Sequence, residues 1–570
     1  MLYLASDGLR SDGGRYERLI EHGALAGPHF AFLPLAAVFA LFSSAHAAGL
    51  GASLGAGIAG AEVLTHALGR RLGSGAFGLA LLLLGLCPAF LLQSTTVEVH
   101  AAAFALAAAA FALVLRRGSR AGRTRYAALA GFALVLGHLS SALWLPAIAW
   151  IAADAPPPSE VRSDGERAAQ RWRRAGACFA GGAAGLAFVF LCGWWATPLP
   201  GEELSPLRSY LRDWLSGAAR PRAFSLSERW ITEVSGALGP LLPLALCGAA
   251  LALRRGARGA AGLSLALCPG PLLALSIGAY ESGAYLLPGL PAVIWLAVLA
   301  LRELARARPA ARALLLLALA LDLAARCAWA SSQALPRGDL AAGDAGLHAW
   351  CASLASELRL PAGSDAALFV ASAGLALLAG RALAERSRPA RRASGGGLAA
   401  LAFCVALQAL AVHGSLLRSP SRDQSELAAF GRDFTRFHGH HSGYLLVGVE
   451  PTENARAILE RIVGRGRTLF LPTRAYGLGD EAARAARAAL DAEHPNARLL
   501  FPPDLFAPLV AARDEEALAW VRARETEGRA RRLPAPELAS FSLAPRWDPM
   551  VASYAARAAR ELPAEARLVT

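Results

Sequence analysis

The most prominent feature of the sequence is a series of long apolar stretches separated by short Arg clusters. Most of these stretches approach the roughly 20 residues that an α-helix needs to cross a bilayer. They lie at 52–68, 76–93, 99–115, 126–153, 176–195, 234–253, 259–277, 284–301, 313–330, 366–380 and 396–413. The pattern predicts a mainly α fold, a polytopic transmembrane helical bundle.

The Arg clusters predict its topology, because basic residues concentrate on the cytoplasmic side of membrane proteins. If all six clusters face the cytoplasm, 126–153 must form a short hairpin with its tip near His138, which gives about twelve crossings. The clusters lie at 70–71, 116–125, 162–174, 254–258, 302–312 and 381–392. The segments predicted to face the other side are those before 52, near Glu98, at 196–233, at 280–283 and at 331–365.

Composition supports the membrane interpretation. The chain is 55% hydrophobic and only 18% charged, whereas soluble domains carry about 25% charged residues. The net charge of +14 comes entirely from Arg, since the sequence contains no Lys. Because the Arg residues lie between apolar stretches, the charge indicates topology and contact with membrane lipid, and we expect no nucleic-acid partner.

After Gly414 the apolar stretches give way to mixed, charged sequence. We therefore divide the chain into a transmembrane domain, 1–414, and an extracytoplasmic domain, 415–570. In the second, short apolar runs predict strands at 444–449, 468–471 and 498–501, and amphipathic patterns predict helices at 454–463 and 481–492. This is the pattern of a small α/β domain.

The N-terminal 50 residues combine an acidic outer loop with a short apolar segment at 30–47, which we interpret as a juxtamembrane or re-entrant helix. The sequence shows no basic segment followed by an apolar one, as a signal peptide would. We expect that the start codon is assigned too late and that a transmembrane helix precedes this chain. The alternative is that later spans translocate the polar segment.

Polar residues that could carry chemistry gather on the predicted outer side. Asp12 precedes two glycines, which allow close approach of a substrate, and Arg15 could pair with an anionic group. A solvated turn followed by a surface helix over 14–22 explains the same residues.

Glu98 and His100 lie two residues apart, where one predicted span ends on the outer side and the next begins. Ionisable groups at such an interface require a water-filled cavity or a partner. His138 lies at the predicted hairpin tip, and Glu281 stands in a short outer turn followed by Tyr285. The alternatives are solvation at a helix end for Glu98, burial against neighbouring helices for His138, and a tyrosine-anchored turn for Glu281.

Metal and redox chemistry have little support in the sequence. Most of the eight Cys lie in or beside apolar stretches, and there is no C-x-x-C pair. We interpret the cluster of His438, His440 and His441 as a solvated loop. We expect no metal or other cofactor, with a single Mg²⁺ left open.

The order of these motifs resembles the GT-C class of membrane glycosyltransferases, most closely the protein O-mannosyltransferase-like family. That family carries an acidic D-x-G-[EF] motif followed by H-P-P-G-[YF]-P-L. The corresponding residues here are Asp12–Tyr16 and then His29 to Leu35, without the Pro-Pro-Gly. The family's initial transmembrane helix before this Asp agrees with the expected upstream helix.

Three later motifs complete the resemblance over about residues 1–300. The family's E-V-Y is similar to Glu98-Val99-His100, its Gly-His hairpin to Gly137–Pro146, and its acidic-x-x-x-Y-x-x-P turn to Glu281–Pro288. The resemblance implies transfer of a sugar from a polyprenyl-phosphate donor to an extracytoplasmic protein hydroxyl, glycan or lipid, with inversion.

The resemblance also implies roles for individual residues. Asp12 would be the general base. The residues that would bind substrate, including its phosphate, are Arg15, Tyr16, His29, Glu98, His100, His138, Glu281 and Tyr285, with Arg208 or Arg212 as further phosphate ligands. The location would be the bacterial inner membrane, with the C-terminal domain periplasmic.

Two other classes of function stay open. A transporter or lipid flippase would use similar spans, although the sequence shows neither internal repeats nor paired broken helices. A non-catalytic membrane scaffold is compatible with the missing Pro-Pro-Gly and with His100 in place of the family's Tyr.

Overall fold

The computed structural model describes most of the helical region and short pieces of the C-terminal region. The described residues are 13–25, 30–116, 120–154, 164–196, 198, 204–215, 230–257, 259–276, 283–304, 307–332, 364–385, 445–447, 468–470, 499–501, 523, 526 and 530–532. The chain divides into two compact units, and each is considered by itself. The first is Met1–Asp7, Tyr16–Leu335 and Ala342–Arg418, and the second is Gly8–Arg15, Pro336–Ala341 and Ser419–Thr570.

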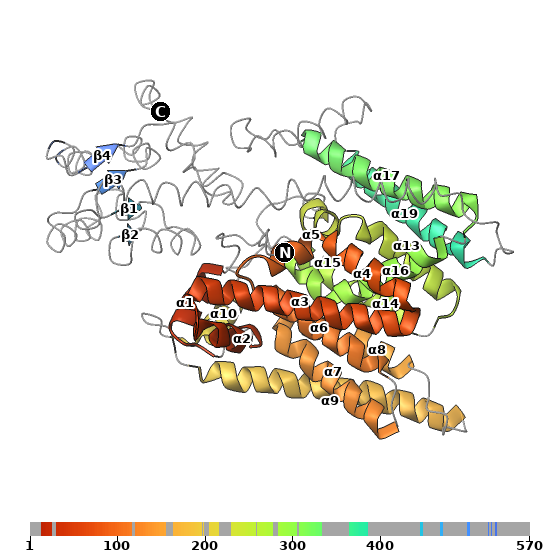
Figure 1. Ribbon diagram of the computed structural model, residues 1–570, viewed down its shortest axis with the longest axis horizontal. Coiled ribbons are helices and arrows are strands. Elements are labelled where there is room, and N and C mark those ends of the chain that lie inside the picture. Colours follow the sequence, from red (N-terminus) through yellow and green to blue (C-terminus); the bar gives the residue numbers. More distant parts are fainter. Residues whose placement is uncertain are drawn as a thin grey trace. The chain divides into compact units, whose positions relative to one another are not determined.

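The first unit is a bundle of Ala- and Leu-rich helices (Figure 1). In chain order these are α1 (Gly13–Glu21), α2 (Phe32–Ala40), α3 (Ala45–Leu72), α4 (Ser74–Gly85), α5 (Pro88–Ser94), α6 (His100–Leu115), α7 (Arg120–Gly137), η2 (Leu139–Trp144), α8 (Leu145–Asp154), α9 (Asp164–Trp194), α10 (Pro206–Leu215), η3 (Trp230–Ser235), α12 (Gly236–Leu238), α13 (Leu241–Arg254), α14 (Ala260–Leu265), α15 (Pro269–Ser276), η4 (Ala284–Gly289), α16 (Leu290–Leu304), α17 (Pro309–Ser332) and α19 (Asp365–Ala384).

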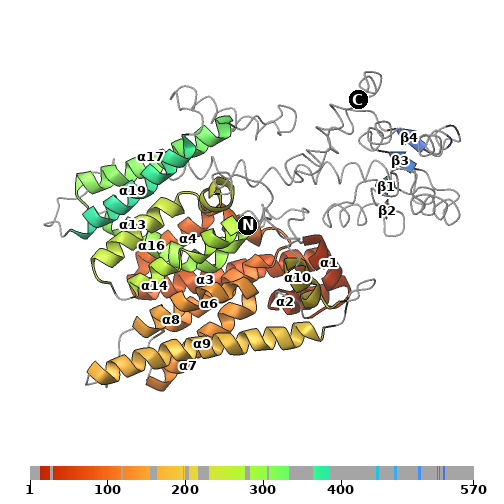
Figure 2. The ribbon, with the colours of Figure 1, turned by 180° about the vertical axis from the view of Figure 1, so that it is seen from behind.

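The helices pack in two series. In the first, α3 packs against α6, α6 against α7, and α7 against α9. In the second, α17 packs against α19, α19 against α13, and α13 against α16. Figure 2 shows both series from behind. Helix α16 also contacts α4 and α6, so the two series share one apolar core.

Glycine allows close packing between α7 and α9. A Cβ on Gly131 of α7 would collide with the Cys178 carbonyl of α9, and a Cβ on Gly181 of α9 would collide with the Ala128 carbonyl of α7. Small residues at such a crossing let two helix backbones touch, which is how helices commonly associate where the hydrophobic effect is weak.

Several helices are long and apolar enough to cross a membrane, as the sequence predicts. Among the described residues there are four, Ala45–Leu72, Asp164–Trp194, Ala284–Leu304 and Asp365–Ala384, and α4 with α5 makes a fifth if that bent pair is one span. The chain is therefore a mainly helical, multi-pass membrane protein. The total of about twelve crossings stays a prediction.

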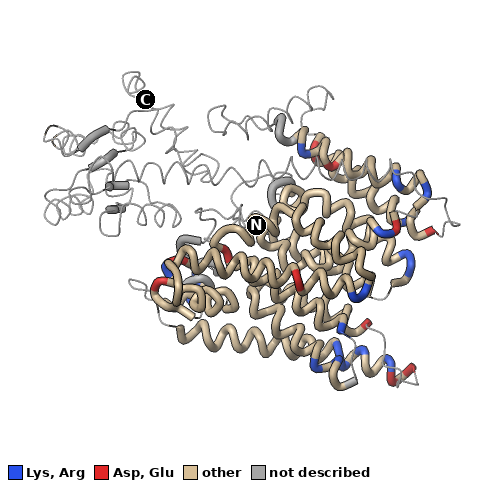
Figure 3. Tube along the Cα trace, in the orientation of Figure 1, with Lys and Arg blue, Asp and Glu red and all other residues tan. Residues whose placement is uncertain are grey.

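The Arg-rich segments of the bundle share one end. Figure 3 shows the blue segments gathered mainly at the right-hand ends of the helices. This arrangement agrees with the prediction that the Arg clusters lie on a common side, and the side of the membrane that they face stays a prediction.

Three apolar stretches predicted as continuous spans are broken. Stretch 76–93 bends by 73° between α4 and α5, because Pro88 at the start of α5 has no N–H to continue the first helix. Stretch 234–253 turns at Gly239, where φ is 61°. Stretch 259–277 divides into α14 and α15 just before Pro269. The prediction of single straight helices was wrong at these places.

The predicted hairpin over 126–153 is confirmed as a break at His138. Helix α7 ends at Gly137, His138 is extended with φ −164° and ψ 138°, and the 3₁₀ helix η2 leads into α8. Helices α7 and α8 pack against each other on either side of this break.

The N-terminal segment forms two short helices against α3. Helix α1 buries Tyr16, Leu19 and Ile20, so the helix expected over 14–22 has one face in the core. Helix α2 occupies part of the apolar segment at 30–47 and packs on α3. Helix α3 begins at Ala45, earlier than the apolar stretch indicated.

Among its described residues, the second unit has two pairs of short parallel strands. β1 (Leu445–Val447) pairs with β2 (Thr468–Phe470), with Leu446 opposite Leu469, and β3 (Leu499–Phe501) pairs with β4 (Ala530–Arg532). The strands predicted at 444–449, 468–471 and 498–501 are confirmed. β4 was not predicted, and the helices predicted at 454–463 and 481–492 lie outside the described residues, as do His438, His440 and His441.

Candidate functional site

One face of α3 holds together two segments that the sequence singled out. His46, Gly49 and Ser53 lie on this face, because residues three, four or seven apart project from the same side of a helix. Ser53 Oγ donates to the Glu98 carbonyl oxygen at 2.9 Å, and it accepts from the Glu98 N–H at 3.1 Å. A single hydroxyl therefore binds both backbone polar groups of Glu98.

Gly49 allows the neighbouring segments to approach α3. A Cβ at this position would lie 2.7 Å from Val97 Cγ1 and 3.3 Å from Ile20 Cδ1. The position therefore receives side chains from both the loop before α6 and helix α1. A larger residue would push one of them away.

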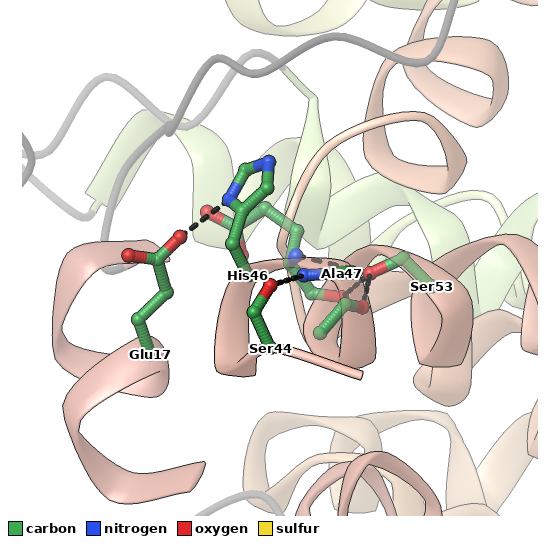
Figure 4. Close-up of polar contacts among 7 residues, drawn as sticks. Glu17, Ser44, His46, Ala47 and Ser53 are labelled. Carbon is green, nitrogen blue, oxygen red and sulfur yellow. Dashed lines mark hydrogen bonds and ion pairs between the residues drawn. The ribbon is translucent and has the colours of Figure 1, made fainter. Parts of the chain in front are cut away.

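A buried Glu–His pair fixes α1 to α3. His46 Nδ1 donates to Glu17 Oε1, and the two side chains are only 11% and 8% exposed. Figure 4 shows the Glu17 carboxylate pointing at the His46 ring. Because α1 begins immediately after Asp12, this pair also fixes the helix that follows the proposed base.

Three predicted site residues meet in one ring cluster. His100 begins α6, His138 lies between α7 and η2, and Tyr285 lies in η4. The two imidazoles stack with centroids 5.0 Å apart and planes 24° apart, and the Tyr285 ring lies edge-on to them at 5.7 and 6.0 Å. All three side chains are buried.

The hydrogen bonding of His138 determines which ring nitrogen can donate. The Ser140 N–H donates to His138 Nδ1 at 3.1 Å, and the Ser140 hydroxyl lies 2.7 Å from the same nitrogen. Because Nδ1 accepts, the neutral ring carries its proton on Nε2. His138 is thereby oriented to act as a donor through Nε2.

A run of buried polar residues leads from α5 to Glu98. Thr95 and Thr96 satisfy the C-terminal end of α5 by donating to the Leu91 and Leu92 carbonyls at 2.8 and 3.0 Å. The Glu98 carboxylate accepts from the Val99 N–H at 3.2 Å, and its side chain is buried. The oxygens of a buried carboxylate can accept hydrogen bonds from a polar ligand.

The ring cluster lies where irregular helical segments converge. Segment η4 contacts η2, α5 and α6, and α15 contacts both η3 and η4. Irregular backbone is tolerated at membrane depth only where protein buries it or where it lines a cavity. In secondary transporters, discontinuous helices of this kind form the substrate site.

A small apolar pocket adjoins the cluster through η2 and η4. Its lining includes Trp144, Leu238, Leu242, Pro271, Leu286 and Val293. Trp144 is fixed there because its indole N–H donates to the Ala266 carbonyl at 3.0 Å. The lining of this pocket is mainly apolar.

The other predicted site residues have different outcomes. Tyr16 is buried with its ring edge-on to Phe32 at 5.5 Å, and it lies in α1 rather than in the ring cluster. The backbone of Arg15 lies in α1, but its side chain is outside the described part of the structure. Asp12, His29 and Glu281 are also outside the described residues.

The two outer-loop Arg candidates differ from each other. The Arg208 guanidinium lies over the Trp194 ring at 4.6 Å, a cation–π contact, and Arg212 is exposed.

A second buried ion pair, Asp322–Arg326 in α17, was not among the candidates. The signal for it was two opposite charges four residues apart inside an apolar stretch.

Sequence reasoning also missed Glu17, His46 and Ser53. Their partners are distant in the chain, so spacing gave no indication of the contacts. Among the residues that the structure describes, no group of three His, Cys, Asp or Glu side chains could hold a metal ion.

No protein-family model and no curated protein matches this chain. Among solved structures, it is similar to ArnT from Cupriavidus metallidurans. With ArnT bound to undecaprenyl phosphate the identity is 16%, the match covers 85% of each chain, and the TM-score is 0.48. With ArnT in the apo state the identity is 16%, the match covers 90% of this chain and 88% of ArnT, and the TM-score is 0.48.

Proposed function

We propose that this protein is a membrane glycosyltransferase of the GT-C type. It transfers a hexosyl group, with mannosyl as the first candidate, from a polyprenyl-phosphate donor to a hydroxyl of an extracytoplasmic acceptor. The observation that carries this proposal is the meeting of His100, His138 and Tyr285 in one buried cluster. These residues come from three motifs that resemble motifs of that class. Glu98 belongs to the same motif as His100 and lies two residues before it.

In the proposed reaction Asp12 takes the proton of the acceptor hydroxyl. The acceptor oxygen then forms a bond to the anomeric carbon, and the bond from that carbon to the phosphate oxygen breaks. The products are the glycosylated acceptor and the polyprenyl phosphate, with the proton on Asp12. A single displacement inverts the configuration at the anomeric carbon.

The ring cluster would bind the sugar and orient the donor. His138 donates from Nε2 to a sugar hydroxyl or phosphate oxygen, and Glu98 accepts from sugar hydroxyls. Aromatic rings at His100 and Tyr285 provide flat apolar surface beside those polar groups. Arg15, His29 and Glu281 would complete the polar surroundings.

The proposal is tested by glycosyl transfer in membranes from cells that express the chain. Radiolabelled polyprenyl-phosphate sugars are supplied, and wild type is compared with Asp12→Asn and with Asp164→Asn. Asp164 is an exposed carboxylate paired with Arg167 at 3.3 Å, and it serves as the matched control. Transfer by wild type and Asp164→Asn but not by Asp12→Asn supports the proposal, and full activity of Asp12→Asn contradicts it.

The bend between α4 and α5 favours one second candidate, a lipid flippase. Broken helices are common in transporters, and the structure contains such a break where the sequence indicated none. Asp12→Asn separates the two functions, because it abolishes a sugar transfer that needs a base and leaves lipid movement between leaflets unchanged.

A further inference from the structure

The buried ion pair in α17 presents unused hydrogen-bond donors. Arg326 Nη2 donates to Asp322 Oδ2 at 2.6 Å and to the Gly239 carbonyl at 3.1 Å. These two bonds use both hydrogens of Nη2. Arg326 Nε and Nη1 are buried, and within the part of the chain that the structure describes they have no hydrogen-bond partner. Three N–H groups of the guanidinium are therefore unsatisfied there.

The carboxylate of the pair is already engaged. Asp322 Oδ1 accepts from the Ser235 hydroxyl at 3.4 Å, and Oδ2 accepts from Arg326. The side chains of Asp322 and Arg326 are only 2% and 9% exposed. Buried donors without acceptors are costly, and the unused donors belong to a permanently charged group whose geometry suits oxyanions.

The surroundings of Arg326 connect it to the candidate site. Gly239 and Ser235 belong to the turn at η3 and α12, whose Ala237 carbonyl accepts from the Cys87 thiol at 3.7 Å in the bend between α4 and α5. Helix α12 also packs against α5, and α5 packs against η4, which carries Tyr285. The predicted topology puts the carboxyl end of α17 on the same membrane side as Glu98.

From this geometry we propose that Arg326 is a phosphate-binding residue. Its Nε and Nη1 hydrogens donate to the oxygens of a phosphate group, while Asp322 and the Gly239 carbonyl hold the guanidinium in place. The inference deepens the proposed function, and rests on it for the choice of phosphate among oxyanions. The group comes either from a polyprenyl phosphate or from free phosphate.

The test measures binding rather than transfer. The full chain in nanodiscs is titrated with a radiolabelled polyprenyl phosphate, with the matching polyprenol, and with inorganic phosphate. Arg326→Gln is expected to weaken binding of the polyprenyl phosphate by roughly tenfold or more, because it removes charged hydrogen bonds. Binding of the polyprenol is expected to stay unchanged. Arg312→Gln, which removes another α17 guanidinium bonded to the Leu304 carbonyl at 3.2 Å, is the matched control.

A double variant separates binding from folding. Arg326→Gln leaves the Asp322 charge buried, and Asp322→Asn/Arg326→Gln removes both charges. If the double variant recovers thermal stability but still binds polyprenyl phosphate weakly, Arg326 is a ligand. If it recovers binding as well, or if Arg326→Gln binds normally, the inference is overturned.

The remaining outcomes identify the source of the phosphate and distinguish this inference from the proposed function. Arg326-dependent stabilisation by inorganic phosphate, without binding of the lipid, supports the site and assigns it to free phosphate. The protein could instead bind the polyprenyl phosphate in a way that depends on Arg326 and yet transfer no sugar. That result contradicts the proposed function and leaves this inference standing.

Discussion

Ser53 on α3 holds Glu98 by both of its backbone polar groups, as donor to the carbonyl at 2.9 Å and as acceptor from the N–H at 3.1 Å. Ser53 lies 45 residues before Glu98 in the chain. Helix α3 therefore sets the position of the loop before α6. This contact links the N-terminal helices to the predicted acidic motif.

Ser53→Ala is expected to lower sugar transfer about tenfold. It leaves the buried Glu98 N–H and carbonyl without their partner, and such losses cost about 1–3 kcal/mol per group. Transfer assays on purified protein check this. Ser264→Ala, which removes only a bond to the Ala260 carbonyl of its own helix at 2.8 Å, should keep full activity. Equal losses in the two variants would show a general packing defect instead.

Gly49→Ala is expected to destabilise the protein by roughly 1–3 kcal/mol, because the added methyl collides with Val97. Gly176→Ala on α9 is the matched control, since a Cβ there meets no atom of the described residues within 4 Å. Ala is also the better helix former, so the control should be neutral or slightly stabilising. Thermal unfolding in detergent measures both, and an unchanged melting temperature in Gly49→Ala would refute the close approach of the loop.

Glu17→Gln is expected to loosen α1 from α3, because it removes the charge that accepts from His46. Hydrogen exchange should increase in residues 13–21 more than in α3 itself. Glu62→Gln, an exposed change on α3, should leave the exchange of α1 unchanged. Matching exchange profiles for wild type and Glu17→Gln would mean that apolar packing alone holds α1.

Substitutions in the ring cluster are expected to separate shape from hydrogen bonding. Tyr285→Phe keeps the ring beside His100 and His138, and should retain much of the transfer activity. Tyr285→Leu removes the edge-on aromatic contacts, worth about 0.5–1.5 kcal/mol each, and should lower activity further. The two activities, with protein folding checked by thermal unfolding, decide whether the ring itself is needed.

The C-terminal domain is expected to recognise the acceptor. Deletion of 420–570 should change which acceptors receive the sugar while binding of the polyprenyl phosphate continues. Transfer to an unchanged range of acceptors by the truncated chain would contradict this role.

The helical bundle could be predicted from the lengths of the apolar stretches, because stretches of this length have few other stable arrangements. The break at His138 could be predicted as well, since all six Arg clusters can face the same side only if the chain turns back within 126–153. The breaks at Pro88, Gly239 and Pro269 were missed, because a single residue that stops a helix leaves the stretch around it as long and as apolar as before.

The ring cluster was partly predictable and the α3 contacts were not. His100 and Tyr285 lie at the starts of apolar stretches and His138 at the predicted hairpin tip. All three are predicted to lie on the same side, so their proximity could be expected. The bonds from His46 to Glu17 and from Ser53 to Glu98 depend on the rotation of α3 about its axis, which a weakly amphipathic helix does not encode in its pattern.

The glycine contacts between α7 and α9 also limit how a long lipid could enter. Where two backbones touch directly, no side chain can change rotamer to open a gap. These two helices should move together as one rigid body. A lateral opening would then have to form along contacts filled by flexible side chains.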